Sequence, residues 1–208
     1  MSFHGWLVFA GFWVVFVTSP GPNAANCIQN GMAHGFARAL WGVAGILTQA
    51  TLFLCLSALG VTALIAASPV AFTVAKFAGA ALLIWFGIKG WMRATKPLRA
   101  TGLQTRHIYT RAFAIATINP KSVAGYLAAF SQFVQPEVPI LTQMWVITPT
   151  ALAITTASYC TYTALGAWLG QRALSAVANT AIRRGLAACF ILYGVALAFA
   201  SVPTGGPI

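Results

Sequence analysis

The segment SPGPN, Ser19 to Asn23, places two prolines and a glycine inside a long apolar run without charged residues. Proline lacks an N–H, so a helix that runs through Pro20 and Pro22 leaves the carbonyls of Phe16 and Thr18 without their usual donors. In lipid these carbonyls need partners inside the protein, and a break at membrane depth is tolerated only where it is buried or lines a cavity. The segment therefore predicts a broken membrane helix with a site beside it.

The composition is that of an integral membrane protein. Of the 208 residues, 59% are hydrophobic and 6% are charged, and the mean hydropathy is +0.81. Such a chain cannot cover a globular surface with polar groups. The apolar runs lack the alternation of barrel strands, which favours helices, and several exceed the roughly 20 residues that a spanning helix needs. The N-terminus has no Lys or Arg before Arg38 and is not expected to be a removable signal peptide.

Most of the net charge of +11 lies in short stretches between apolar runs. In a soluble protein this charge would indicate a nucleic-acid partner, but short basic loops beside apolar runs mark the cytoplasmic face of a membrane protein. The basic residues of these loops are Lys89, Arg93, Lys96, Arg99, Arg106, Arg111, Arg172, Arg183 and Arg184. Glu137 is the only acidic residue and has no basic neighbours, so we expect it outside. The expected partner is the lipid bilayer, with no nucleic acid.

Six membrane helices account for the order of runs and breaks. We expect them at about residues 5–29, 40–66, 70–92, 111–134, 141–169 and 185–201, with a turn at Gly31, His34 and Gly35 after the first. SPGPN interrupts the first helix and Asn119-Pro120-Lys121 interrupts the fourth. Both termini then lie outside and every basic loop lies inside.

The six helices predict one transmembrane domain built from two halves. Residues 1–92 form a first three-helix repeat, 93–110 a basic cytoplasmic loop and 111–208 a second repeat that enters the membrane in the opposite direction. This is the inverted-repeat plan of many secondary transporters, in which paired helix breaks mark the transport site.

The chemistry expected at the breaks is that of a zwitterion site. Pro22 and Pro120 suit the first turn of new half-helices, with Asn119 as the cap of the second. Two free helix N-termini favour an anion such as a carboxylate, and Lys121 adds a full positive charge. The carbonyls of Phe16, Thr18 and Ala116 are free to accept from an ammonium. The candidate binding residues are Pro20, Gly21, Pro22, Asn23, Asn26, Gln49, Asn119, Pro120, Lys121 and Gln132.

The motifs together resemble those of the LysE/RhtB family of amino-acid exporters. The resemblance rests on SPGPN, AKFAGAALLIWFGIKG at 75–90, NPKSVAGYLAAFSQF at 119–133 and the closing GLAACFILYGVALAF. Pro20 to Asn23 and Asn119 to Lys121 match the family's signature positions, and Gln132-Phe133 matches the end of its PQF-like motif, with Ser131 where a proline is common. The resemblance implies a bacterial inner-membrane exporter of amino acids or their analogues that runs on the proton gradient.

The chain departs from the family at one chemically important place. Many members have an acidic residue in the second helix, where this chain reads GILTQAT with Gln49 as the equivalent. The chain has no Asp, and its Glu lies outside the membrane runs. An embedded carboxylate is the usual proton carrier, so either Lys121, His34 or a water path takes part in its place, or the coupling differs. The lack of an acid also favours a neutral over a cationic amino acid.

Other interpretations of the same residues remain open. The prolines can be plain kinks, Lys121 can extend to the cytoplasmic surface, and the buried amides can simply join helices. A passive channel for small solutes explains the missing carboxylate. A membrane thiol-electron carrier would need a cysteine near each break, and only Cys27 lies near one.

Three further expectations concern cofactors, assembly and packing. The histidines are not spaced as metal ligands, so neither a metal nor a cofactor is expected. Whether the chain forms a homo-oligomer is left open. Small residues at 79–81 and 194–196 suit close helix packing. The tryptophans are expected to be interface anchors: Trp6, Trp13, Trp41, Trp85, Trp91, Trp145 and Trp168.

Overall fold

A computed structural model describes residues 2–96 and 107–200, and over these residues the chain forms eight helices and no strand. The helices are α1 Phe3–Thr18, α2 Pro22–Ala67, α3 Pro69–Met92, α4 Ile108–Ile118, α5 Pro120–Phe133, α6 Ile140–Leu169, α7 Gln171–Val177 and α8 Thr180–Ala200. The predicted all-α class is confirmed for this part of the chain. Most of the predicted basic loop, at 97–106, lies outside the described residues.

Four stretches among the described residues are long and apolar enough to cross a membrane. They are Pro22–Gly60, Thr73–Met92, Ile140–Leu169 and Thr180–Phe199. The shorter apolar helices α1 and α4 each end at a predicted break, and α2 and α5 begin just beyond. The short helix α7 was not expected from the sequence.

The helix α2 consists of two segments that meet at Gly35. This glycine has φ 71° and ψ 168°, a backbone conformation that side chains with a Cβ rarely adopt. We expected the turn to include Gly31 and His34, but both lie in helix. Gly31 instead allows close packing on α6, because a Cβ there would press against the carbonyl of Thr163. The turn is therefore confined to Gly35.

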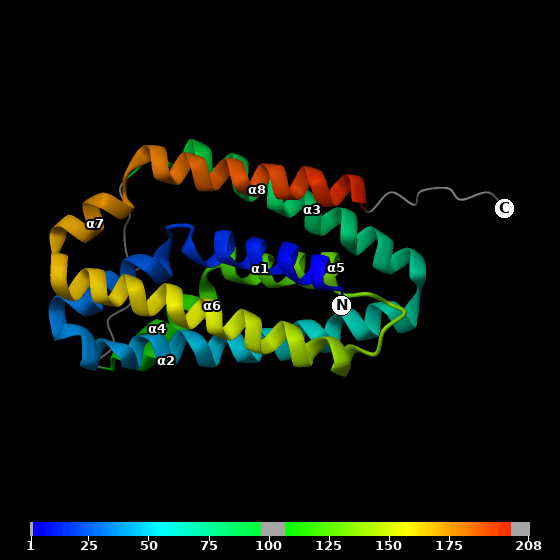
Figure 1. The fold of residues 1–208 in the computed structure, drawn as a ribbon, viewed down its shortest axis with the longest axis horizontal. Helices are drawn as coiled ribbons and strands as arrows, with labels where there is room; N and C mark the ends of the chain where they lie inside the picture. The colour runs from blue at the N-terminus through cyan, green and yellow to red at the C-terminus, as the bar shows by residue number, and fades with distance from the viewer. Residues whose placement is uncertain (1, 97–106, 201–208) are drawn as a thin grey trace.

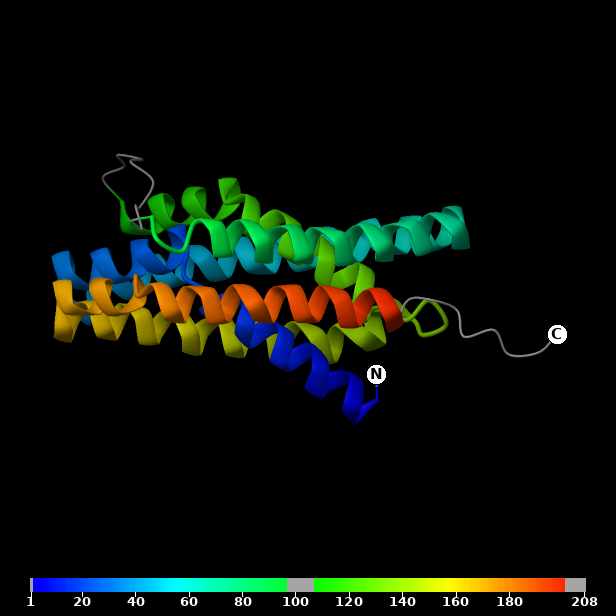
Figure 2. The ribbon, with the colours of Figure 1, turned by 90° about the horizontal axis from the view of Figure 1, so that it is seen from above.

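The helices form layers along one common direction. Figure 1 shows α3 and α8 side by side, α1 and α5 next to them, and α2, α4 and α6 beyond. The turn at Gly35, α7 and the start of α4 lie at one end of the molecule. The start of α1, the junction of α2 with α3, and the α5–α6 connection that contains Glu137 lie toward the other end, as Figure 2 also shows. The basic connections therefore gather at one end, called the basic end below.

The helix starts follow from local chemistry. Ser68 caps α3, its Oγ accepting the N–H groups of Val70 and Ala71 at 3.2 and 3.4 Å. Pro22 begins α2, and the Asn119 Oδ1 caps α5 by accepting the Lys121 N–H at 3.1 Å. The predicted first-turn prolines and the predicted Asn119 cap are thus confirmed.

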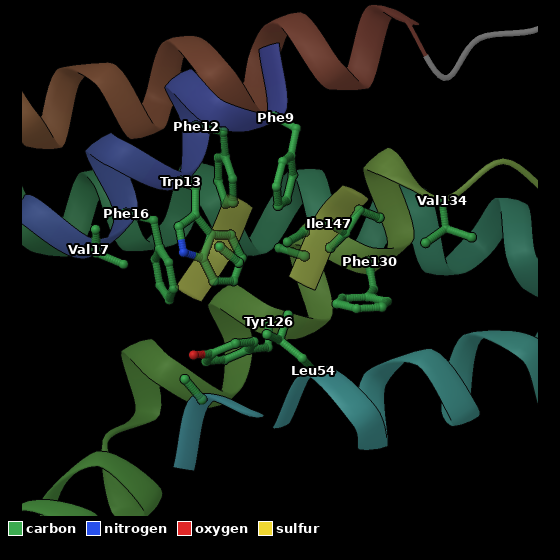
Figure 3. Close-up of a cluster of buried hydrophobic side chains, with 14 of the residues drawn as sticks. Phe9, Phe12, Trp13, Phe16, Val17, Leu54, Tyr126, Phe130, Val134 and Ile147 are labelled. Carbon is green, nitrogen blue, oxygen red and sulfur yellow. The ribbon is translucent and has the colours of Figure 1, made fainter. Parts of the chain in front are cut away.

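An aromatic cluster on α1 forms the centre of the core. Figure 3 shows Phe12, Trp13 and Phe16 directed toward Tyr126 of α5. The Trp13 ring lies 5.3 Å from that of Tyr126, and its Nε1–H donates to Thr155 Oγ1 at 3.0 Å. The interface-anchor expectation is therefore wrong for Trp13, which is fully buried because its side of α1 faces α5 and α6.

The helices α3 and α8 pack closely over their length. A Cβ at Gly194 would lie 2.6 Å from Ile84 Cγ1 and 2.9 Å from the Ala80 carbonyl oxygen. At the basic end, the Arg183 guanidinium donates to three carbonyls just beyond the end of α3, those of Arg93, Ala94 and Lys96, at 2.5 to 2.8 Å. The expected close packing at 194–196 is confirmed, while Gly79 of the other small-residue stretch contacts α5.

Candidate functional site

The two helix breaks face each other across the interior of the bundle. The Lys121 ammonium donates from Nζ to the carbonyl oxygen of Ser19 at 2.6 Å, so the first turn of α5 is joined to the end of α1. Gly21 lies beside the lysine stem, where a Cβ would be 3.9 Å from Lys121 Cδ. Residues about 100 positions apart in the sequence therefore meet at one place.

Lys121 has no acidic side chain as a neighbour. Glu137, the only acidic residue of the sequence, is exposed beyond the far end of α5. The Phe16 and Phe190 ring centroids lie 5.4 and 5.9 Å from Lys121 Nζ. An ammonium held by aromatic rings and one carbonyl carries an uncompensated charge, which favours an anionic ligand such as a carboxylate.

A small polar cavity of about 20 Å³ lies beside Lys121. This volume has room for about one water molecule. Both breaks, the second segment of α2 and α6 contribute to its wall. Its polar lining residues are Ser19, Asn23, Gln49, Asn119, Lys121, Ser122, Tyr126, Thr155 and Tyr159.

The helix α6 supplies polar residues that the sequence reasoning missed. Thr155 and Tyr159 line the cavity, and Tyr159 accepts a long hydrogen bond of 3.5 Å from Asn23 Nδ2. The Tyr162 hydroxyl donates to the Thr18 carbonyl oxygen at 2.5 Å. The expectation that Thr18 offers a free carbonyl to an ammonium is therefore wrong. The signal available in the sequence was the four-residue spacing of Thr155, Tyr159 and Thr163 on one face of a helix.

Several buried amides at this site lack hydrogen-bond partners. Asn26 is fully buried, and neither polar atom of its side chain has a partner. The Oδ1 of Asn23 and the Nε2 of Gln49 are also buried and without partners. Buried polar groups are normally hydrogen-bonded. Unpartnered amides that gather near one cavity therefore indicate that a polar guest belongs there.

A wide vestibule leads from the breaks toward the basic end. Its volume is about 580 Å³, within the range of small-molecule sites. Pro20, Gly21 and Pro22 line one side, and Ala187 and Phe190 of α8 line the other. Its charged lining residues are Lys89, Arg93, Lys96, Lys121 and Arg183. Lys121 borders both the vestibule and the cavity, so an anion that enters the vestibule meets this ammonium at the breaks.

The structure brings most of the candidate binding residues together. Gly21, Asn23, Gln49, Asn119 and Lys121 line the cavity, while Pro20 and Pro22 line the vestibule. Pro120 begins α5 beside them, and Asn26 lies one turn beyond Asn23 on α2.

Gln132 is the candidate that lies elsewhere. Its Nε2 donates to the carbonyl of Lys76 in α3, near the opposite end of α5 from Lys121. The helix of 14 residues separates the two side chains by about 16 Å along its axis. Gln132 therefore joins α5 to α3 and does not line the cavity.

Comparisons with known proteins agree on one family. The family model described as LysE type translocator matches residues 14–201. An uncharacterised membrane protein of Vibrio cholerae is 34% identical to this chain over 96% of it and 99% of the relative. A homoserine/homoserine lactone efflux protein of Salmonella typhimurium is 29% identical over 96% of this chain and 98% of the relative. A leucine efflux protein of an Enterobacter species is 27% identical over 74% of each chain.

No solved structure matches this chain. The assignment to a family therefore rests on the sequence model and on the relatives, both of which cover nearly the whole chain. The chain belongs to the LysE type translocator family.

Proposed function

We propose that this protein is a secondary transporter that exports a neutral amino acid or amino-acid analogue across the bacterial inner membrane. The observation that carries the proposal is the contact of Lys121 Nζ with the Ser19 carbonyl, which makes one site of both helix breaks. The ammonium receives the substrate carboxylate, and the carbonyl of Ser19 then accepts from the substrate ammonium. Export of small metabolites also agrees with the names of the efflux relatives.

The proposed architecture has six membrane crossings in two inverted repeats within a single transmembrane domain. The broken pair α1 with the first segment of α2 corresponds to the broken pair α4 with α5. The second segment of α2 corresponds to α6, and α3 corresponds to α8. The basic end is cytoplasmic by the positive-inside rule, which leaves both termini and Glu137 periplasmic.

Alternating access is supported by an asymmetry between these corresponding contacts. At the end away from the basic loops, α5 packs on α3, where Gly79 lies against Ser131 and Gln132 bonds to Lys76. The inverted counterpart would be packing of the first α2 segment on α8. Among the described residues no packing of comparable extent joins these two elements, and the vestibule lies between Pro22 and Ala187 instead.

A second pair of corresponding contacts shows the same asymmetry. The helix α1 packs on α8 through Phe12 and Tyr193, whose ring centroids are 5.7 Å apart. Its counterpart, α4 on α3, shows no packing of comparable extent in the described part of the chain. We infer an inward-facing state, and exchange of the two packing patterns would close the vestibule and open the periplasmic side.

Proton coupling is the remaining part of the proposal. No carboxylate lines the site, so Lys121 is the titratable group that borders both cavity and vestibule. His34 is exposed at the end of the first α2 segment. We propose that Lys121 takes part in coupling by binding a proton in one of two states, the substrate-bound or the empty one, and by releasing it in the other.

The test is transport by the purified protein in liposomes, with a panel of labelled amino acids and with or without an imposed pH gradient. Accumulation against a concentration gradient under the pH gradient supports the coupled exporter. A passive channel only dissipates a substrate gradient, and that result would remove coupling from the proposal. If no amino acid moves faster than in empty liposomes, the exporter proposal is wrong.

A further inference from the structure

Four buried amide side chains line up behind the helix break. Asn23, Asn26 and Asn30 lie three and four residues apart on the first segment of α2, so they share one face of that helix. Gln49 belongs to the second segment. The exposed fractions are 5%, 0%, 3% and 1% in that order. At least one polar side-chain atom of each has no hydrogen-bond partner.

A buried amide elsewhere in the protein does find hydrogen-bond partners. Gln143 on α6 is equally buried, yet its Nε2 donates to the carbonyls of Gln135 and Val138 at 2.9 and 2.8 Å. Its Oε1 accepts the Gln135 N–H at 2.9 Å. A buried amide in this protein can thus be fully bonded. The unpartnered atoms at Asn23 and Gln49 are better explained by a guest than by a general lack of partners.

Asn23 and Gln49 border the same cavity as Lys121, so a molecule held by its carboxylate at Lys121 extends toward these amides. The free atoms are an acceptor, Asn23 Oδ1, and a donor, Gln49 Nε2. Neither amide carries a charge. This set matches a neutral group that both donates and accepts hydrogen bonds, and an alkyl group in the same place would leave both amides unpaired.

We propose that Asn23 and Gln49 recognise the side chain of the substrate, and that this site selects neutral amino acids whose side chain carries a hydroxyl or carboxamide group. The inference rests on the proposed export function and narrows its substrate class. Tyr159 and Thr155 line the same cavity.

The test compares side chains of nearly equal shape in liposomes that contain the purified full-length protein. Unlabelled threonine is compared with valine, and unlabelled asparagine with leucine, as inhibitors of labelled serine transport. We expect threonine and asparagine to inhibit at concentrations at least about tenfold lower than valine and leucine, since a site built for hydrogen bonds rejects analogues that lack them. Equal inhibition by valine and threonine would overturn this inference while leaving amino-acid export intact.

Variants locate the selectivity within the site. Gln49→Leu and Asn23→Leu are expected to lower the threonine-to-valine preference at least about threefold, because each removes one hydrogen-bonding atom from the cavity. Gln171→Leu is the matched control, since Gln171 is exposed on α7, and it should keep the wild-type preference. An unchanged preference in both cavity variants would mean that the amides hold only ordered water. Absence of transport for every amino acid in the wild type would instead reject the export function itself.

Discussion

The Lys121 Nζ and the Ser19 carbonyl oxygen lie 2.6 Å apart and hold the two helix breaks together. The Ser19 carbonyl accepts one N–H of the Lys121 ammonium, whose charge has no acidic partner. An amino-acid zwitterion offers both a carboxylate for the ammonium and an ammonium for the carbonyl, so it can replace this contact without leaving either group unpaired. In the proposed mechanism, the substrate takes the place of this contact.

Removal of the Lys121 charge should abolish transport. Among the described residues that line the cavity, Lys121 is the only cation. Lys121→Ala removes it, so the carboxylate loses its partner, and we expect the initial transport rate to fall at least about tenfold. Transport by purified protein in liposomes measures the effect. Lys76→Ala serves as the control, because Gln132 bonds to the backbone carbonyl of Lys76 and this carbonyl is still present in the variant. A normal rate for Lys121→Ala would show that this lysine only anchors the helix.

The close packing of α3 and α8 should make Gly194 intolerant of a methyl group. Gly194→Ala brings a Cβ against Ile84 and the Ala80 carbonyl, and we expect a loss of about 1–3 kcal/mol in stability, seen as a lower Tm in detergent. Gly185→Ala is the matched control on the same helix, because a Cβ there meets no atom within 4 Å. Equal Tm values for the two variants would contradict the described packing.

A cross-link between α3 and α5 should stop the cycle. With the four native cysteines replaced, Gly79→Cys with Ser131→Cys places two thiols where the helices already touch. Oxidation should lower the transport rate at least about tenfold by holding the periplasmic side closed, and a reducing agent should restore it. The single Gly79→Cys variant, treated with the same oxidant, controls for oxidation elsewhere. Full transport by the cross-linked protein would show that this contact does not open.

The proposed orientation can be tested with single cysteines. Arg172→Cys on α7 and Glu137→Cys between α5 and α6 occupy opposite ends of the molecule and are exposed. A membrane-impermeant thiol reagent added to whole cells with a permeabilised outer membrane should label only Glu137→Cys in a chain without native cysteines. Labelling of Arg172→Cys under the same conditions would reverse the orientation or reject the six crossings.

The breaks were predictable from sequence because their causes are local. Pro22 and Pro120 each lack a backbone N–H, whatever surrounds them in the fold. The Asn119 side chain caps its helix by accepting the N–H of the residue two positions later. The extent of the turn at Gly35 was less predictable from the sequence. Gly31 resembles a turn residue in sequence, and only its contact with α6 reveals a packing role.

The rest of the candidate site depends on which helix faces meet. The four-residue spacing of Thr155 and Tyr159 places them on one face of a helix, but it does not tell which helices and which cavity lie across from that face. Gln132 belongs to the same broken helix as Lys121, yet it lies at the other end of α5. The sequence does not distinguish Trp13 from the other tryptophans, and Trp13 is buried only because α5 and α6 pack over it. These are tertiary relationships, which residue type and spacing do not encode.

The cavity of about 20 Å³ has a consequence for the working range of the protein. Since an amino acid is larger than one water molecule, the helices have to part before it fits, and part of the binding free energy is spent on that separation. The apparent affinity is then weaker than the contacts alone would provide. We expect such a protein to transport little at the ordinary cytoplasmic concentration of its substrate and to export the substrate only when that concentration rises.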